Sequence, residues 1–194
     1  MLKGLKGALF GVPAFMACML LFGPFAAGQE GALPNYRIKP SDVVVPPELK
    51  LGDYQRIIRP FENWTLICDE NLKIRQRVCN VTQIIENGAG QIAFSWSLAA
   101  TKKGEPYMIL RTAPVARSDG RILLKFEGRE EPIQVKLDGC SQTVCVGMLP
   151  IGPMMREQIS KSTTPTVSYP TADGGMISVT ANLKGLSTAV KAIK

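Results

Sequence analysis

Apolar and polar residues alternate along much of the chain from Arg56 onward, which is the period of β-strands whose side chains point to opposite faces. In the clearest run, residues 92–99, Phe94 and Trp96 fall on one side while Ser95 and Ser97 fall on the other. These patterns predict strands that each bury one face. The other runs with this alternation are residues 64–68, 122–126 and 133–137.

Clusters of Asn, Asp, Ser and Gly separate these runs and predict turns at residues 87–88, 118–120, 138–139 and 173–175. Short strands punctuated by such turns are typical of antiparallel all-β domains. We therefore predict an all-β fold, an antiparallel β-sandwich of the jelly-roll-like type, with two helical additions.

The two helices are predicted from the remaining patterns. Pro153 suits the first position of a short helix that continues through Ile159. Near the C-terminus, Leu183, Leu186 and Val190 recur at helical spacing. We expect this C-terminal helix to cover a sheet edge or the open end of the sandwich.

The chain before Arg56 follows a different pattern. Residues 1–28 combine two lysines, an apolar stretch and small residues before Gly28, which predicts a cleaved secretory signal peptide. An uncleaved N-terminal anchor is the alternative. Residues 29–55 contain four prolines and few clustered apolar residues, which predicts an extended tether. The folded domain is then expected over residues 56–194.

Composition excludes several classes of function. Cleavage at Gly28 removes two lysines and no acids, so the net charge falls from +7 to +5. No run of Lys and Arg is long enough to predict nucleic-acid binding. The sequence contains no histidine, which excludes Ser-His-Asp and Cys-His catalysis and His-ligated zinc. Glu130 and Glu131 are adjacent, so on a strand they point to opposite faces and cannot share a substrate. We expect no catalytic residues, no metal and no cofactor.

Four cysteines remain after removal of the signal peptide, and an even number in an exported chain predicts disulfides. Three pairings are open. Local geometry favours Cys68–Cys79, which flanks a turn between two strand-like runs, and Cys140–Cys145, which closes a small loop. A four-thiolate metal site is the alternative, although the gaps do not match the paired short spacings of zinc ribbons.

Four arginines are candidates for an anion-binding patch that would take lipid phosphates or acidic glycans. Arg75 and Arg77 alternate beside Cys79 and would face the same way, with Arg56 and Arg59 nearby. A solvated strand face is the alternative. The two tryptophans fall on the apolar faces of their strands, which favours core packing over a sugar-binding or lipid-binding platform.

The run FENWTLIC at residues 61–68, followed by Cys79, is similar to the opening of the invasion-associated locus B family. Cys140 and Cys145 fall where that family has its second cysteine pair. The sequence LKGL at residues 183–186, leading into a helix of small residues, resembles the closing pattern of the family. The resemblance covers roughly residues 56–194.

The resemblance implies an exported protein of the Gram-negative, alphaproteobacterial envelope, with an all-β domain and no catalytic residues. It also implies an association with host-cell invasion in pathogenic relatives. We therefore expect a non-enzymatic protein, periplasmic, outer-membrane associated or secreted, that binds an envelope component or a host-surface protein. A periplasmic carrier of a small apolar or anionic ligand, and a hydrolase that uses carboxylates alone, are the alternatives.

Overall fold

The computed structural model describes residue 39, residues 43–100 and residues 104–193 of the chain. The predicted signal peptide and most of the predicted tether lie outside the described residues. Ten strands and two short helices make up this described part. The strands are β1 (Tyr54–Phe61), β2 (Trp64–Asn71), β3 (Gln76–Glu86), β4 (Ile92–Ala100), β5 (Pro106–Thr112), β6 (Arg121–Lys125), β7 (Ile133–Cys140), β8 (Cys145–Pro150), β9 (Thr166–Pro170) and β10 (Met176–Thr180), and the helices are α1 (Pro153–Ser160) and α2 (Leu186–Lys191).

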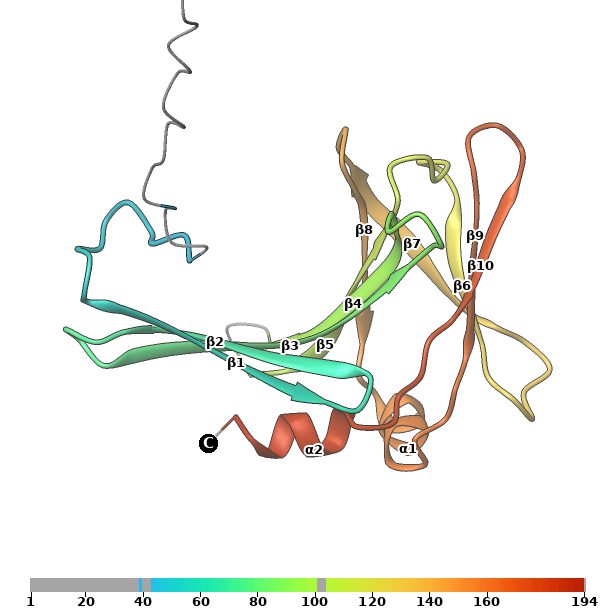
Figure 1. Ribbon diagram of the computed structural model, residues 1–194. Helices are drawn as coiled ribbons and strands as arrows, with labels where there is room; N and C mark the ends of the chain where they lie inside the picture. Colours follow the sequence, from blue (N-terminus) through green and yellow to red (C-terminus); the bar gives the residue numbers. More distant parts are fainter. Residues whose placement is uncertain (1–38, 40–42, 101–103, 194) are drawn as a thin grey trace, which may run out of the picture. The chain divides into compact units, whose positions relative to one another are not determined.

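All ten strands belong to one antiparallel sheet, in the order β1-β2-β3-β4-β5-β8-β7-β6-β9-β10 (Figure 1). The predicted all-β antiparallel fold with a short helix and a C-terminal helix is confirmed. The strand order is that of a five-stranded meander with further strands added, and differs from the double Greek key of a jelly roll. Alternation in the sequence sets which face each side chain takes, but it leaves the neighbour of each strand undetermined.

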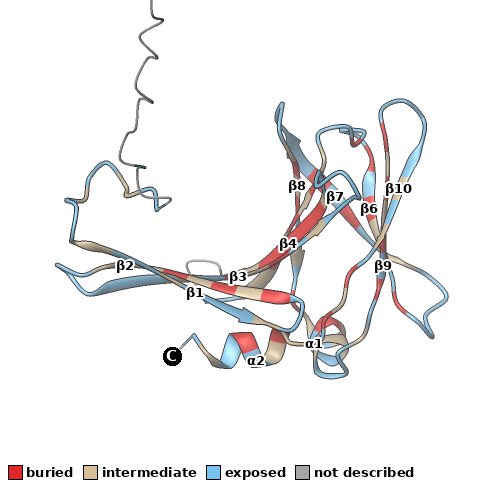
Figure 2. Cartoon of the chain, viewed as in Figure 1, coloured by how far each residue is buried: buried red, intermediate tan, exposed pale blue. Residues whose placement is uncertain are grey.

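The sheet bends back on itself, so both layers around the core come from the same sheet (Figure 1). The hydroxyl of Tyr169 on β9 donates a hydrogen bond to the Ala93 carbonyl on β4, across the interior. Trp64 and Trp96 stack at the centre with ring centroids 5.6 Å apart, and Phe94 packs edge-on against Trp96. Figure 2 shows buried residues concentrated on β2, β4, β6 and β9, whose inward-facing side chains fill the space between the layers.

Helix α2 buries Leu186 and Ala189 against the inner face of the sheet and contacts β1, β2 and β3. It therefore covers a face beside the edge strand, where we had expected an edge or an open end. Apolar side chains of the first strands, Leu66 among them, have no other layer to cover them, which explains this position. Helix α1 occupies the predicted segment, with Pro153 in its first turn.

A close backbone contact joins the loop before α2 to the turn between β1 and β2. Gly185 has a φ of +94° and lies against the backbone of Glu62. The Asn63 amide donates to the Lys184 carbonyl at 3.3 Å, and the Lys184 amine pairs with the Glu62 carboxylate at 2.8 Å. We call this arrangement the turn–loop contact. It ties the second strand of the domain to its last helix.

Two boundaries differ from the prediction. Strand β1 begins at Tyr54, so it includes two residues assigned to the tether. Asp138 and Gly139, predicted as a turn, lie within β7 at a register shift, and the chain reverses at Ser141 instead, where the Ser141 amide donates to the Val144 carbonyl. Neither described helix is long and apolar enough to span a bilayer.

Candidate functional site

The cysteines form the two disulfides that local geometry favoured. Cys68 and Cys79 lie directly opposite each other on β2 and β3 and are bonded, and Cys140 is bonded to Cys145 across the β7–β8 hairpin. Each sulfur is used in a disulfide, so the four-thiolate metal site is not formed. The loop-closure model assigns about 2–3 kcal/mol of stabilisation to loops of these lengths. The role of the four cysteines in this structure is to staple neighbouring strands.

The four candidate arginines do not form one patch. Arg56 pairs with Asp69 and Arg77 with Glu70. Since the two acids are consecutive on β2, these pairs lie on opposite faces of the sheet.

The other two arginines are separated from these pairs and from each other. Arg59 lies over the Phe61 ring and donates to the Ala192 carbonyl at the end of α2. Arg75 is in the β2–β3 turn with a φ of +52°, because Asn71 accepts hydrogen bonds from the amides of Lys73 and Ile74 and ends the strand. The expectation that Arg75 and Arg77 share a strand face is therefore wrong.

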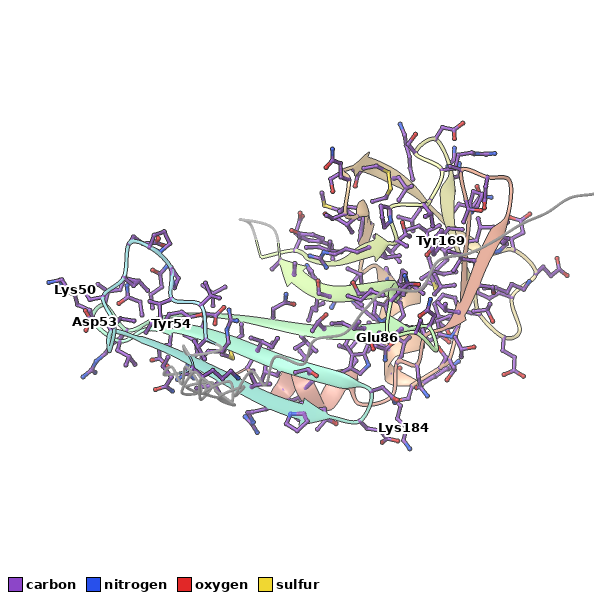
Figure 3. All side chains as sticks on the ribbon, turned by 45° about the horizontal axis from the view of Figure 1, so that its top comes forward. Lys50, Asp53, Tyr54, Glu86, Tyr169 and Lys184 are labelled. Carbon is purple, nitrogen blue, oxygen red and sulfur yellow. A yellow bond between two sulfur atoms is a disulfide. The ribbon has the colours of Figure 1, made fainter. Side chains whose placement is uncertain are left out.

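Asp69 is the centre of a charged cluster at the free end of the β1–β2 ribbon. The Arg56 guanidinium donates to both carboxylate oxygens at 2.7 and 3.0 Å, and the Tyr54 hydroxyl donates at 2.5 Å. The hydrogen bond from Arg56 is the main cause that lowers the pKa of Asp69, and the bond to Asp69 raises the pKa of Tyr54. Figure 3 shows Tyr54 at this outer end, far from Tyr169 in the core. The cluster satisfies its own charges and offers little to a ligand.

The other face of the central strands carries the candidate site. Trp96, Leu110 and Gly147 stand opposite one another on β4, β5 and β8, and the side chains of Trp96 and Leu110 are buried in the core. The residues that alternate with them along each strand therefore point to the other face of the sheet. Strand register places these outward residues in two rows across β3, β4, β5 and β8. We call these two rows the open face: Ile84, Ser95, Arg111 and Val146 in the first, and Thr82, Ser97, Ile109 and Met148 in the second.

The open face is apolar at its margins and lies away from the helices. Ile84 and Met148 are 52% and 54% exposed. The buried residues of α1 and α2 belong to the core on the opposite side of the sheet. Between these margins Ile109 and Val146 are half-buried, and the two serines of β4 are buried beneath their neighbours. An apolar surface that solvent still reaches is a candidate for contact with another molecule.

Arg111 is the one charged residue of the open face. Its guanidinium donates to the Ser97 hydroxyl at 2.8 Å, and the side chain is half-buried. A guanidinium has five N–H donors, and Arg111 uses one of them on a described residue. Among the described residues, no carboxylate pairs with it. An arginine held in this way is suited to a carboxylate, phosphate or sulfate group, because it can donate two parallel hydrogen bonds to it.

Both tryptophans belong to the core, as their strand faces predicted, and Gln83 connects them. Its side chain is buried, accepts the indole N–H of Trp96 at 3.0 Å, and donates to the carbonyls of Asn63 and Asn182. The indole of Trp64 donates to the same Asn182 carbonyl. This network is structural: it satisfies the polar groups of the core at the turn–loop contact.

Neither Arg111 nor Gln83 was predicted from the sequence. The signal for each is a polar residue inside an otherwise apolar strand: Arg111 on an outward position of β5, and Gln83 on an inward position of β3. The partners of these two residues can be named only once the strand neighbours are known. The serine beside Arg111 lies on β4, and the Asn182 carbonyl that Gln83 contacts lies near the C-terminal helix.

Comparison with known proteins decides the family. The family model described as "Invasion associated locus B (IalB) protein" matches residues 64–194. The chain belongs to the IalB family. Among solved structures, the crystal structure of invasion associated protein B from Bartonella henselae resembles this chain with a TM-score of 0.58 and 12% identity, covering 70% of this chain and 92% of that chain. At this identity the likeness shows a common fold. No curated protein matches the sequence.

The IalB match includes all four paired cysteines, both helices and the open face. Strand β1 precedes the matched region, although it pairs along its whole length with β2. The resemblance inferred from the FENWTLIC run, the order of the cysteines and the closing pattern is thereby confirmed.

Proposed function

We propose that this IalB-family chain is an exported, non-enzymatic binding protein of the cell envelope, which holds its partner on the open face. Export is supported by the N-terminal signal pattern and by the two disulfides, since such bonds persist in oxidising compartments. A non-enzymatic role is supported by the lack of histidine in the sequence and by the exposed position of Glu130 and Glu131 in the β6–β7 connection.

The observation that carries the binding role is Arg111 on the open face. Charged side chains surrounded by apolar ones usually have a carboxylate partner, because the loss of hydration is costly otherwise. Here the guanidinium has a serine hydroxyl and apolar side chains as its strand neighbours, and no carboxylate of the described residues forms an ion pair with it. A partner that supplies an acidic group within an apolar surface complements this arrangement. An envelope component and a host-surface protein both fit that description.

Compartment is tested by cell fractionation combined with non-reducing peptide mapping of the native protein. The expected result is a chain that begins near Gln29, lies outside the cytoplasm, and contains the two disulfide-linked peptide pairs. Recovery of cytoplasmic protein with four free thiols would contradict the export part of the proposal.

The binding surface is tested by photo-crosslinking in intact cells. A photoreactive residue in place of Met148 is expected to give a discrete adduct, and one in place of Glu127, in an exposed turn outside the open face, is expected to give none. Adding Arg111→Gln should reduce the Met148 adduct by roughly tenfold or more, as for a central arginine in an interface. The matched control, Arg129→Gln, should leave it unchanged. Equal adducts from both photoreactive positions, or an adduct indifferent to Arg111, would exclude the open face as the binding surface.

A further inference from the structure

A second surface, independent of the open face, lies between the two helices on the inner side of the sheet. It is a groove of about 350 Å³ whose floor includes Leu98 on β4. Its walls come from the facing sides of α1 and α2. This volume is at the lower end of the range for small-molecule sites, which are typically apolar with a few polar groups placed to orient the ligand.

Helical spacing brings apolar and polar side chains to the groove in a fixed arrangement. On α2, Ser187 and Lys191 are four residues apart, and Val190 lies beside them on the same wall. On α1, Arg156 and Ile159 are three residues apart and form the opposite wall. Each helix therefore contributes an apolar side chain and a cation to the same cavity.

The charge of the groove has one sign. Arg156 and Lys191 are its only charged lining residues in the described chain, and neither makes an ion pair with another described residue. The Arg156 guanidinium donates to the Ile151 carbonyl at 3.3 Å, which holds it at the wall and leaves its other N–H groups available. The adjacent acid, Glu157, is already paired with Lys161 at 2.6 Å.

We propose that this groove binds a monomeric anionic amphiphile, with the acyl chain between Ile159 and Val190 and the acidic head group between Arg156 and Lys191. Apolar walls favour a hydrocarbon chain by removing it from water. Two cations in the lining of one groove favour a carboxylate or phosphate head group over a neutral or cationic one. The Ser187 hydroxyl supplies a further donor to the head group.

The test uses the purified, disulfide-intact chain and three ligands with the same alkyl chain: decanoate, decanol and decyltrimethylammonium. Calorimetry below the micelle concentration should show decanoate binding at least tenfold more tightly than either of the others. Methyl resonances of Leu98, Ile159 and Val190 should shift with decanoate. Equal affinity for all three ligands, or shifts confined to methyl groups elsewhere, would overturn the proposal.

Variants separate the head-group and chain contributions. Arg156→Gln and Lys191→Gln should each weaken decanoate binding by about fivefold, the effect of one partly exposed charge pair. Val190→Asp should abolish binding, and its side chain is exposed enough for the fold to tolerate the change. Lys73→Gln makes the same charge change at an exposed position of the β2–β3 turn, outside the groove, and should have no effect.

A membrane surface is a different partner, and it is distinguished by sedimentation with phosphatidylglycerol vesicles. Binding to vesicles without binding to free decanoate would contradict the proposal. Since the open face lies on the other side of the sheet, Arg111→Gln should leave decanoate affinity unchanged. Failure of the photo-crosslinking experiment and failure of the decanoate experiment are thus independent results.

Discussion

Replacing Gly185 with alanine tests the turn–loop contact, because this glycine is required there for two separate reasons. Its φ of +94° lies in the left-handed region that side-chain-bearing residues rarely adopt. A Cβ atom built on Gly185 would also lie 2.0 Å from the carbonyl oxygen of Glu62 and 3.0 Å from its carbonyl carbon. Both atoms belong to the backbone, so no side-chain rotation can relieve the overlap.

The expected cost is the sum of these two effects. A left-handed conformation costs a residue other than glycine about 1–2 kcal/mol. Displacing a packed backbone segment to admit one more carbon costs about 1–3 kcal/mol. Gly185→Ala should therefore lower the free energy of unfolding by roughly 2–5 kcal/mol. That is a large fraction of the stability of a typical single domain.

Urea unfolding of the oxidised protein measures this change, with fluorescence of the buried Trp64–Trp96 stack as the signal. Gly128→Ala is the matched control for backbone conformation: its φ is +76°, and a Cβ there would meet no atom within 4 Å. It should cost only the conformational part, about 1–2 kcal/mol. Gly88→Ala, with open space and no positive φ, should change stability by less than about 0.5 kcal/mol. If Gly185→Ala costs no more than Gly128→Ala, the close approach to Glu62 has no energetic role.

Two further variants test the core network and the charged cluster. Gln83→Met should lower the free energy of unfolding by about 2–4 kcal/mol, because the indole N–H of Trp96 loses its acceptor in the core. In the same urea assay, the control Gln76→Met, at the exposed start of β3, should be nearly neutral. Asp69→Asn should cost at most about 1 kcal/mol at neutral pH, since water reaches both side chains of the Arg56 pair, which are 34% and 38% exposed. Because the pKa of Asp69 is lowered in the folded state, this contribution is present above about pH 4 and is lost as the pH falls through the folded-state pKa. The stabilities of the wild type and Asp69→Asn should therefore converge in acid. A difference that persists at low pH would show that the ionised Asp69 carboxylate is not the source of the stability.

Local patterns in the sequence predicted β2, β4, β6, β7 and both helices, because each of these depends on neighbouring residues, whereas β5 and β8 were not predicted. The alternation around Trp96 became β4, and Pro153 does begin α1. Strand β1 was also not predicted, because its apolar residues do not alternate: Ile57 and Ile58 are adjacent, and Pro60 falls within the strand. Its strand conformation comes from pairing with β2, which no local pattern encodes.

The candidate site needed information that lies far apart in the chain. Arg75 and Arg77 are two residues apart, so they would share a face of a continuous strand. The Asx turn at Asn71 instead places Arg75 outside the strand. The open face forms because β8 pairs with β5, although β6 and β7 lie between them in the sequence. This pairing brings Val146 beside Arg111. Such pairing depends on long-range packing, so charge type and alternation alone could not distinguish a paired arginine from one without a carboxylate partner.

The position of α2 also determines when the domain can be completed. The indole of Trp64 finds its acceptor 118 residues further along, and Arg59 finds its carbonyl 133 residues further along. During synthesis or passage through a narrow channel, the first strands emerge while the segment that shields their apolar side is still missing. A chain truncated before Gly185 would leave Leu66 and its neighbours in contact with water, and would be prone to self-association. Folding to the native state therefore waits for α2 and the Gly185 loop before it.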